Sequence, residues 1–393
     1  MRPGRPAPLV LVPEPGEPVA PFGSYAAVGE TAQHLLAADL AARLGRAGAG
    51  VQPLAPAARG EGFHWGRWYA AAARDALAAA RQAGREVDAI GYAGPGAMVL
   101  APDEAIEELL SPIPGEVVAN NRFSADAFVV AAAAPGHAPD GTPRIGPDLA
   151  RALERLDACP TDNTAARCLE SGGFGVRDLA GQPWTRFDVD TPLDLALLRL
   201  ATRLPGHPRP GQALAGFLEM ARLPGDRGLV VPHVEALGEV MRDRTGQLVV
   251  AGRIPAGLLR HLETETACRV RAFVEERGMR AARDLRPRSL LARWVQERGA
   301  VSLVAELAAL GDAVILDTRV LMAALATSSD AAAWPPAEER FASDFGDAAR
   351  IGTGWLRELV EAASAASVPV LLGGHALVSD GLRLLVEAAW LGR

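Results

Sequence analysis

The segment from residue 186 to residue 195, Arg-Phe-Asp-Val-Asp-Thr-Pro-Leu-Asp-Leu, constrains the fold more than any other part of this 393-residue chain. Its first half alternates apolar and acidic residues, which predicts a buried strand over 186–190 with Asp188 and Asp190 on one face. Thr191 and the proline that follows it are typical of a helix start. A strand that leads directly into a helix is a basic element of layered α/β folds.

Asp188 and Asp190 also make this segment a candidate binding site. Two carboxylates that share a face at the C-terminal end of a strand can bind a hard cation such as Mg²⁺. Open α/β sheets bind their ligands at that edge. The alternative is that both residues only end a strand and help to cap a helix. We therefore regard Asp188 and Asp190 as candidate metal ligands and candidate catalytic residues.

Length and charge limit the architecture and the class of partner. A chain of 393 residues exceeds one ordinary core, so two domains are expected. The net charge of −7 argues against general nucleic-acid binding. No apolar run approaches the roughly 18 residues of a membrane span, and the apolar stretch at 9–12 is too short for a signal peptide. The sequence thus predicts a cytoplasmic protein that partners neither nucleic acid nor membrane.

The three cysteines, Cys159, Cys168 and Cys268, have no paired spacing. Such a scatter predicts neither a metal framework nor a disulfide. This expectation agrees with a reducing cytoplasm, where disulfides are rare.

Strand and helix patterns alternate along both halves of the chain. Residues 1–203 predict a layered α/β domain with a largely parallel sheet. Residues 204–228 are rich in Pro and Gly and predict a linker. The alternation is clearer over 229–393, which predicts a Rossmann-like parallel sheet. No Gly-x-Gly-x-x-Gly fingerprint is present, so dinucleotide binding of the usual kind is not expected.

Polar residues follow four strands expected in the second half. These strand ends carry Arg253; Glu275, Glu276 and Arg277; Asp317 and Arg319; and Gly373, Gly374 and His375. The C-terminal ends of parallel strands meet at one edge, where a ligand crevice forms. Arginines there suit bidentate recognition of phosphate or carboxylate.

The last of these strand ends adds two further chemical groups to the edge. The glycine pair permits close backbone approach to an anion, and His375 can act as an acid or a base. Arg340 and Asp344 are expected to reach the same edge from a later loop. The alternative is that all these residues are solvated strand ends with local salt bridges.

The first half resembles the GT-A-type nucleotidyltransferases, among them the molybdenum-cofactor and phospholactate guanylyltransferases. The resemblance covers about residues 8–202 and rests on the segment 188–195 and on the helix start at 101–110. It implies a mixed sheet flanked by helices. It also implies that a nucleotide or sugar phosphate binds with Mg²⁺ at Asp188 and Asp190 for phosphoryl-type transfer.

The chain departs from that family at two places. The loop at 13–18 contains no basic residue, and the stretch 94–98 contains no carboxylate where the family holds its metal. A nucleotidyltransferase-like domain that has lost catalysis is therefore the alternative. In that case the first half serves as a scaffold or homodimer surface, and the strand ends of the second half bind a phosphorylated or carboxylated metabolite.

A further polar group follows the strand expected at 116–119. The candidates to line a sugar or nucleotide pocket are Asn120, Asn121, Arg122, Ser124 and Asp126, with Asp162 and Asn163 nearby in the pattern. The alternative is that these residues only form a turn, a role in which Asn and Asp are common.

Overall fold

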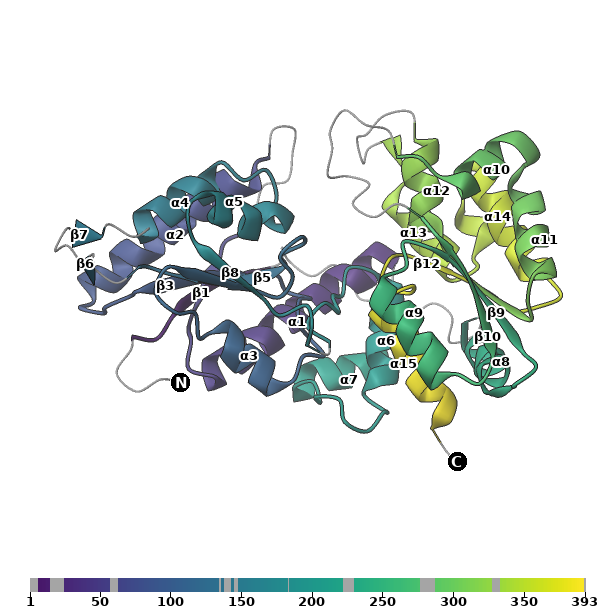
Figure 1. The fold of residues 1–393 in the computed structure, drawn as a ribbon, viewed down its shortest axis with the longest axis horizontal. Helices are drawn as coiled ribbons and strands as arrows, with labels where there is room; N and C mark the ends of the chain where they lie inside the picture. Colours follow the sequence, from purple (N-terminus) through teal and green to yellow (C-terminus); the bar gives the residue numbers. More distant parts are fainter. Residues whose placement is uncertain are drawn as a thin grey trace. The chain divides into compact units, whose positions relative to one another are not determined.

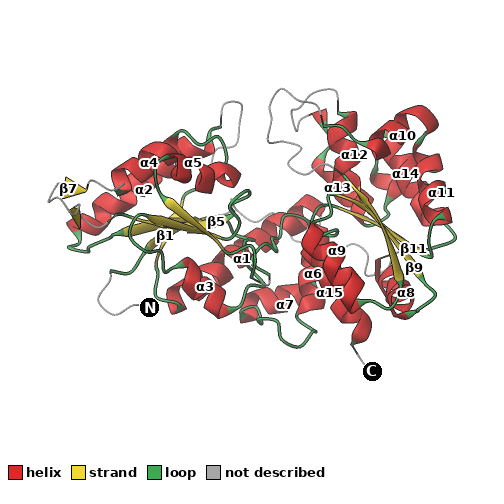
Figure 2. Cartoon of the chain, viewed as in Figure 1, coloured by secondary structure: helices red, strands yellow, loops and turns green. Residues whose placement is uncertain are grey.

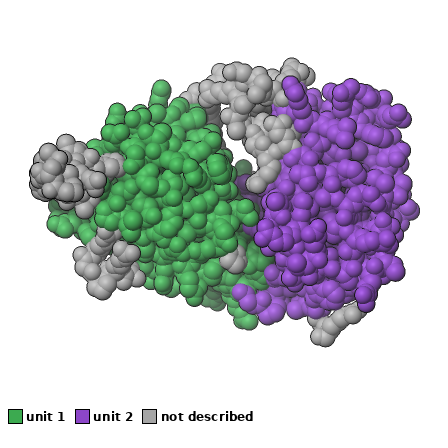
Figure 3. Space-filling view, in the orientation of Figure 1, with its two compact units in different colours: residues 1–19, 30–189, 207–217 green, residues 20–29, 190–206, 218–393 purple. Residues whose placement is uncertain are grey.

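The computed structural model describes most of the chain, namely residues 6–14, 25–56, 63–133, 136–137, 143–144, 148–182, 184–221, 230–275, 287–326 and 333–391. The chain forms two compact units, which Figure 3 draws in different colours. Unit 1 comprises residues 1–19, 30–189 and 207–217, and unit 2 comprises residues 20–29, 190–206 and 218–393. Both units are α/β structures, as predicted. No helix in the described ranges is long and apolar enough to cross a bilayer.

The sheet of unit 1 has six strands in the order β2-β1-β3-β5-β4-β8. β5 is antiparallel to both of its neighbours, and the other pairs are parallel. The strands are β1 (Leu9–Pro13), β2 (Gly50–Leu54), β3 (Ala89–Ala93), β4 (Glu116–Ala119), β5 (Ala127–Ala131) and β8 (Gly175–Asp178). The prediction of a mixed sheet is confirmed. A separate two-stranded pair joins β6 (Gly136–His137) and β7 (Pro143–Arg144).

Helices cover both faces of this sheet (Figure 2). They are α1 (Tyr25–Arg46), α2 (Trp65–Gln82), α3 (Asp103–Leu109), α4 (Leu149–Asp157) and α5 (Ala165–Ser171), with η1 (Asp162–Thr164) before α5. Alternate residues of β1 point to opposite faces. Leu9 and Leu11 pack with α2, α4 and α5. Val10 and Val12 pack with α1 and α3.

The sheet of unit 2 has four parallel strands in the order β10-β9-β11-β12. The strands are β9 (Gln247–Gly252), β10 (Arg269–Val274), β11 (Ala313–Asp317) and β12 (Val370–Gly373). The second strand in sequence lies outside the first, and the third and fourth lie on its other side. This is a doubly wound order whose direction reverses between β9 and β11. The prediction of a Rossmann-like parallel sheet is confirmed.

The helices of unit 2 form two layers around its sheet (Figure 1). One layer contains α8 (Val230–Arg242), α9 (Ala256–Glu265) and α15 (Asp380–Trp390). The other contains α10 (Leu290–Arg298), α11 (Ala300–Ala309), α12 (Thr318–Leu325), α13 (Ala337–Asp344) and α14 (Gly354–Ala365). A further helix, α6 (Pro192–Ala201), packs against α15 and α13. The remaining helix, α7 (Gln212–Met220), lies within residues 204–228, which the sequence predicts to be a linker.

The strand predicted at 186–190 is not formed. The segment is extended without a ladder partner, although its burial alternates as predicted, with Phe187 and Val189 buried and Asp190 exposed. Single hydrogen bonds replace the ladder. Val189 N donates to Gly96 O at 3.3 Å, and Gln33 Nε2 donates to Val189 O at 2.7 Å. Both hydrogen bonds are made by the backbone of Val189, so the segment has no repeated pairing of the kind that defines a strand in a sheet.

The junction between the units falls inside the same segment. Val189 ends the long stretch of unit 1, and residues 190–206 belong to unit 2. The sequence analysis instead placed the whole segment in a first domain that ends at residue 203. The difference arises because α6 packs within unit 2, where Leu193 lies against Gly373 and Leu197 lies against Gly381.

The predicted helix start at Thr191 is confirmed. Thr191 Oγ1 accepts a hydrogen bond from Asp194 N at 3.3 Å, and Asp194 Oδ2 accepts one from Thr191 N at 2.8 Å. This reciprocal arrangement is a capping box, and Pro192 occupies the first helical position.

Cys159 and Cys168 form a disulfide, so the prediction of no disulfide is wrong. The two residues lie at the end of α4 and within α5, which pack against each other and bring their Cα atoms within 6.4 Å. The spacing of nine residues between these cysteines matches no known disulfide motif. The packing of α4 against α5 brings them together, and this packing is not visible in the local sequence. Cys268 is free and buried.

Gly252, the last residue of β9, provides a test of this fold. Its φ is 138°, and a Cβ placed there would lie 2.3 Å from Cβ of Asp317. We expect Gly252→Ala to lower the free energy of unfolding by about 3 kcal/mol. Gly257→Ala, in the first turn of α9, meets only the end of Arg383 and should be neutral or stabilise by up to about 1 kcal/mol. Chemical denaturation measures both, and equal effects would contradict the packing described.

Candidate functional site

The C-terminal ends of the strands of unit 2 place Arg253, Asp317 and Gly373 along one edge of its sheet. β9 and β11 are adjacent there and lie where the order of the strands reverses. Ligands of open α/β sheets bind outside the strand ends at such a reversal. Arg253 and Asp317, two of the polar residues predicted for this edge, therefore lie at the ends of neighbouring strands.

Asp317 lies at the centre of this edge. Its carboxylate is fully buried and forms a bidentate ion pair with Arg253, with Nε to Oδ2 at 2.7 Å and Nη2 to Oδ1 at 3.1 Å. Oδ1 also accepts a hydrogen bond from Arg319 N at 3.1 Å, which caps α12. Because Gly252 has no side chain, β9 can approach the Asp317 side chain closely.

A second buried ion pair lies beside the first. Arg319 donates from Nη1 and Nη2 to the two oxygens of Asp344, at 2.7 and 2.6 Å. Nη1 also donates to Thr318 Oγ1 at 2.9 Å. The Thr318 hydroxyl in turn donates to Gly373 O at 3.2 Å, which connects α12 to the end of β12. We call Arg253, Asp317, Thr318, Arg319 and Asp344 the strand-end network.

Asp194, from the capping box of α6, adds a further buried carboxylate to this region. Its Oδ2 accepts hydrogen bonds from Asp190 N, Thr191 N and Thr191 Oγ1. Burial and the nearby charge of Asp190 raise the pKa of Asp194 to about 7, although the three donors act to lower it. Arg319 experiences its charge as well. Burial acts to lower the pKa of Arg319, but the carboxylates of Asp344, Asp317 and Asp194 raise it overall.

The buried polar side chains in the described part of unit 2 are Asp194, Asp317, Thr318, Arg319, Ser343, Asp344 and Asp380. Four of them, Asp317, Thr318, Arg319 and Asp344, form the strand-end network at this edge, and the charge of Asp194 acts on Arg319. Buried ion pairs contribute little to stability compared with well-packed apolar side chains. Their concentration where ligands bind in this fold class therefore points to function.

Only some of the other residues predicted for this edge lie close to the strand-end network. Gly374 lies against the side chain of Arg319. His375 is half-buried on the turn that follows, and its carbonyl accepts a hydrogen bond from Ser379 Oγ at 2.8 Å. Glu275 instead caps α10 through Ser289 Oγ and Leu291 N. Glu276 and Arg277 lie outside the described residues.

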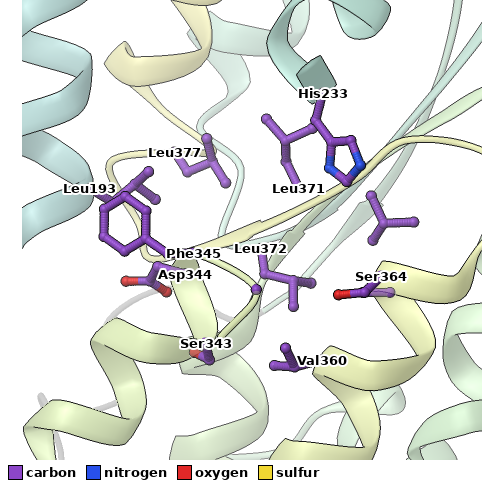
Figure 4. Close-up of a pocket in the computed structure, with 13 residues that line it drawn as sticks. Leu193, His233, Ser343, Asp344, Phe345, Val360, Ser364, Leu371, Leu372 and Leu377 are labelled. Atoms are coloured by element: carbon purple, nitrogen blue, oxygen red, sulfur yellow. The ribbon is translucent and has the colours of Figure 1, made fainter. Parts of the chain in front are cut away.

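A small cavity is lined in part by Asp344 of the strand-end network (Figure 4). Its volume is about 30 Å³, and its lining is mainly apolar, with Leu193, Phe345 and Leu372 among the lining residues. Burial lowers the pKa of His233, which also lines it. Such a volume holds about two water molecules, so this cavity does not accommodate a metabolite.

The polar group predicted after β4 forms a turn. Asn120 is buried, and its Oδ1 accepts hydrogen bonds from Asp126 N and Ala127 N, both at 3.0 Å. Asn121 Oδ1 accepts one from the amide of the next residue but one. Arg122 pairs with Glu170. The side chains of Asn120, Asn121 and Arg122 therefore bind the protein itself, as in the alternative interpretation.

The charges of three carboxylates of unit 1 act on the hydroxyl of Tyr92, near the C-terminal end of β3. Burial raises the pKa of this hydroxyl, and the charges of Asp162, Asp126 and Asp188 raise it further. The three carboxylates are half-buried and come from three different segments. Asp188 Oδ1 lies 2.7 Å from the position that a Cβ would take at Gly96, so only glycine fits there. We call Asp126, Asp162 and Asp188 the acidic edge of unit 1. The sequence associates Asp162 with the group that contains Asp126, but it gives no sign that Asp188 belongs with them.

The two residues of the predicted metal pair differ in burial. Asp188 is half-buried, and Asp190 is exposed. Within the described residues, no group of three or more His, Cys, Asp or Glu side chains has the arrangement of a metal site. Binding of Mg²⁺ at Asp188 and Asp190 stays a prediction.

Comparison of this chain with models of protein families found no match, and a search of curated proteins also found none. The resemblance to nucleotidyltransferases remains a prediction, and functional inference depends on the geometry described above.

The buried carboxyl of Asp194 predicts an unusual dependence of stability on pH. Folded Asp194 keeps its proton up to about pH 7, whereas the unfolded residue loses it near 3.8. The folded state thus binds more protons between these values, so stability should fall as the pH rises from about 4 to about 7, by on the order of 4 kcal/mol. Asp194→Asn should lack this decline, which denaturation at several pH values measures. The exposed Asp75→Asn is the control, and identical curves for wild type and Asp194→Asn would exclude the effect.

Proposed function

We propose that unit 2 binds the phosphate or carboxylate group of a small metabolite at its strand-end network. The observation that carries this proposal is the ion pair of Arg253 with Asp317 at the reversal of strand order. Open α/β sheets bind ligands in this crevice. Arginine recognises planar or tetrahedral anions through paired N–H groups.

Arg253 is the member of the network that is available to a ligand. Its side chain is 21% exposed, whereas that of Asp317 is fully buried. Nε and Nη2 bind Asp317, and Nη1 makes no hydrogen bond to any described residue. Asp317 fixes the plane of the guanidinium and thereby presents the remaining N–H groups in one direction. This preorganisation lowers the entropic cost of binding.

The start of α9 supports the same position for the anion. The helix begins three residues after Arg253, at Ala256, and its N-cap Pro255 provides no side-chain hydrogen bond. Helix N-termini carry unpaired amides and a partial positive charge that favour anions. By contrast, the N-terminus of α12 is already capped by Asp317. The anion is therefore assigned to the side of Arg253 and α9.

Binding of sulfate tests this proposal, because sulfate is an anion that does not titrate near neutral pH. Arg253→Lys keeps a positive charge beside Asp317 but loses the free guanidinium edge. We expect the affinity for sulfate, measured by calorimetry, to fall about tenfold or more, as for loss of a hydrogen bond to a charged group. Arg293→Lys on exposed α10 is the matched control. Unchanged affinity in Arg253→Lys would exclude Arg253 from the site.

A second candidate function belongs to unit 1, where we infer binding of a nucleotide or sugar phosphate together with Mg²⁺. The acidic edge of unit 1 supports it, because the charges of three half-buried carboxylates act on Tyr92 at the end of β3. Mg²⁺ commonly binds through one or two carboxylates together with phosphate oxygens and water. Asp188 fits such a role without a complete protein cage. The ion, when bound, would neutralise charge during phosphoryl-type transfer.

Thermal unfolding with nucleoside triphosphates tests the second candidate. Addition of GTP or ATP with Mg²⁺ should raise the melting temperature of the wild type, because ligand binding stabilises the folded state. Asp188→Asn should abolish this increase, whereas Asp75→Asn on α2 should retain it. Stabilisation that persists in Asp188→Asn, or that does not require Mg²⁺, would argue against this function. Absence of any stabilisation favours a scaffold role for unit 1.

A further inference from the structure

β10 forms an edge of the sheet in unit 2 and is poorly covered. Its only partner among the described strands is β9. None of its six residues is buried, although four of them, Val270, Ala272, Phe273 and Val274, are apolar. Val274 is 56% exposed. Exposed apolar edge strands are templates for pairing with another strand.

The hydrogen bonds to β9 determine which groups of β10 face outward. Arg269 N donates to Gly246 O at 2.9 Å, and Glu275 N donates to Gly252 O at 2.8 Å. Successive residues of a strand direct their N–H and C=O groups to alternate sides. The odd-numbered residues therefore bond to β9. Val270, Ala272 and Val274 direct their backbone groups to the open edge.

The charged residues of β10 indicate what this edge pairs with. Arg269 and Arg271 are exposed and form no ion pair with any described residue. Glu275 uses Oε1 to cap α10, and its Oε2 makes no hydrogen bond within the described part of the chain. An antiparallel strand centred opposite Ala272 would place residue 269 of each strand opposite residue 275 of the other. Two copies of this strand are therefore complementary in charge.

We propose that two copies of this chain associate through β10, by antiparallel pairing about a two-fold axis at Ala272. Val270 then pairs with Val274 of the second copy, and both residues direct backbone groups across the interface. Opposite charges in facing positions stabilise antiparallel pairs. A register centred on Arg271 would instead place like charges opposite each other. The two four-stranded sheets become one sheet of eight strands. The proposal rests on the fold and not on the proposed function.

The variant Ala272→Pro tests the interface with little effect on the folded monomer. Ala272 directs its N–H outward, so Ala272→Pro removes a hydrogen bond across the interface and none to β9. Arg271→Pro is the matched control, because Arg271 directs its N–H to β9. We expect light scattering to show a dimer for the wild type, and a dissociation constant at least tenfold higher for Ala272→Pro. At a concentration at which both variants are monomeric, we also expect a lower melting temperature for Arg271→Pro than for Ala272→Pro, because only Arg271→Pro removes a hydrogen bond to β9.

Charge reversal provides a second, milder test. Arg269→Glu should weaken the dimer, because it places two carboxylates opposite each other in the proposed register. Arg293→Glu on α10 should not. A wild type that stays monomeric over the whole accessible concentration range overturns the proposal. A dimer that is as stable in Ala272→Pro and Arg269→Glu as in the wild type also overturns it, because another surface must then form the contact.

Discussion

The ion pair between Arg253 and Asp317 is the interaction on which the arrangement of unit 2 depends. Asp317 joins three elements, since it ends β11, caps α12 and receives the guanidinium from the end of β9. Its charge is compensated only while all three elements keep their positions. Removal of one partner would leave a buried charge without compensation, which is far more costly than the pair itself is stabilising. The crevice geometry is therefore coupled to the integrity of the sheet, and α6 and α13 contribute through Asp194 and Asp344.

Much of the fold was predictable because its signals are local. The strands before Arg253, Asp317 and Gly373 are short apolar runs followed by glycine or polar residues, and their parallel order follows from the helices between them. The capping box at Thr191 is a pattern of four residues and was equally accessible. The gathering of Arg253, Asp317 and Arg319 was predictable for the same reason, since strand ends of a parallel sheet share one edge.

What the sequence did not reveal depends on contacts between distant segments. Nothing local shows that the charges of Asp126 and Asp188 act on the same hydroxyl of Tyr92, or that Cys159 and Cys168 are adjacent after α4 packs on α5. The ladder expected for 186–190 failed because alternating burial also describes an extended segment without a partner strand. α4 was not assigned, although Asp148 at its N-cap and its amphipathic spacing provide a signal. The division between the units could not be placed, because the packing of α6 is a tertiary property.

The chain passes between the two units several times, which limits the fragments into which this protein can be divided. Residues 20–29 and 190–206 belong to unit 2, although both lie between segments of unit 1. Neither unit is therefore one continuous piece of the gene. A fragment from a single cut that contains the whole of one unit therefore also contains part of the other. The two sheets cannot be separated by one cut of the chain with both units complete.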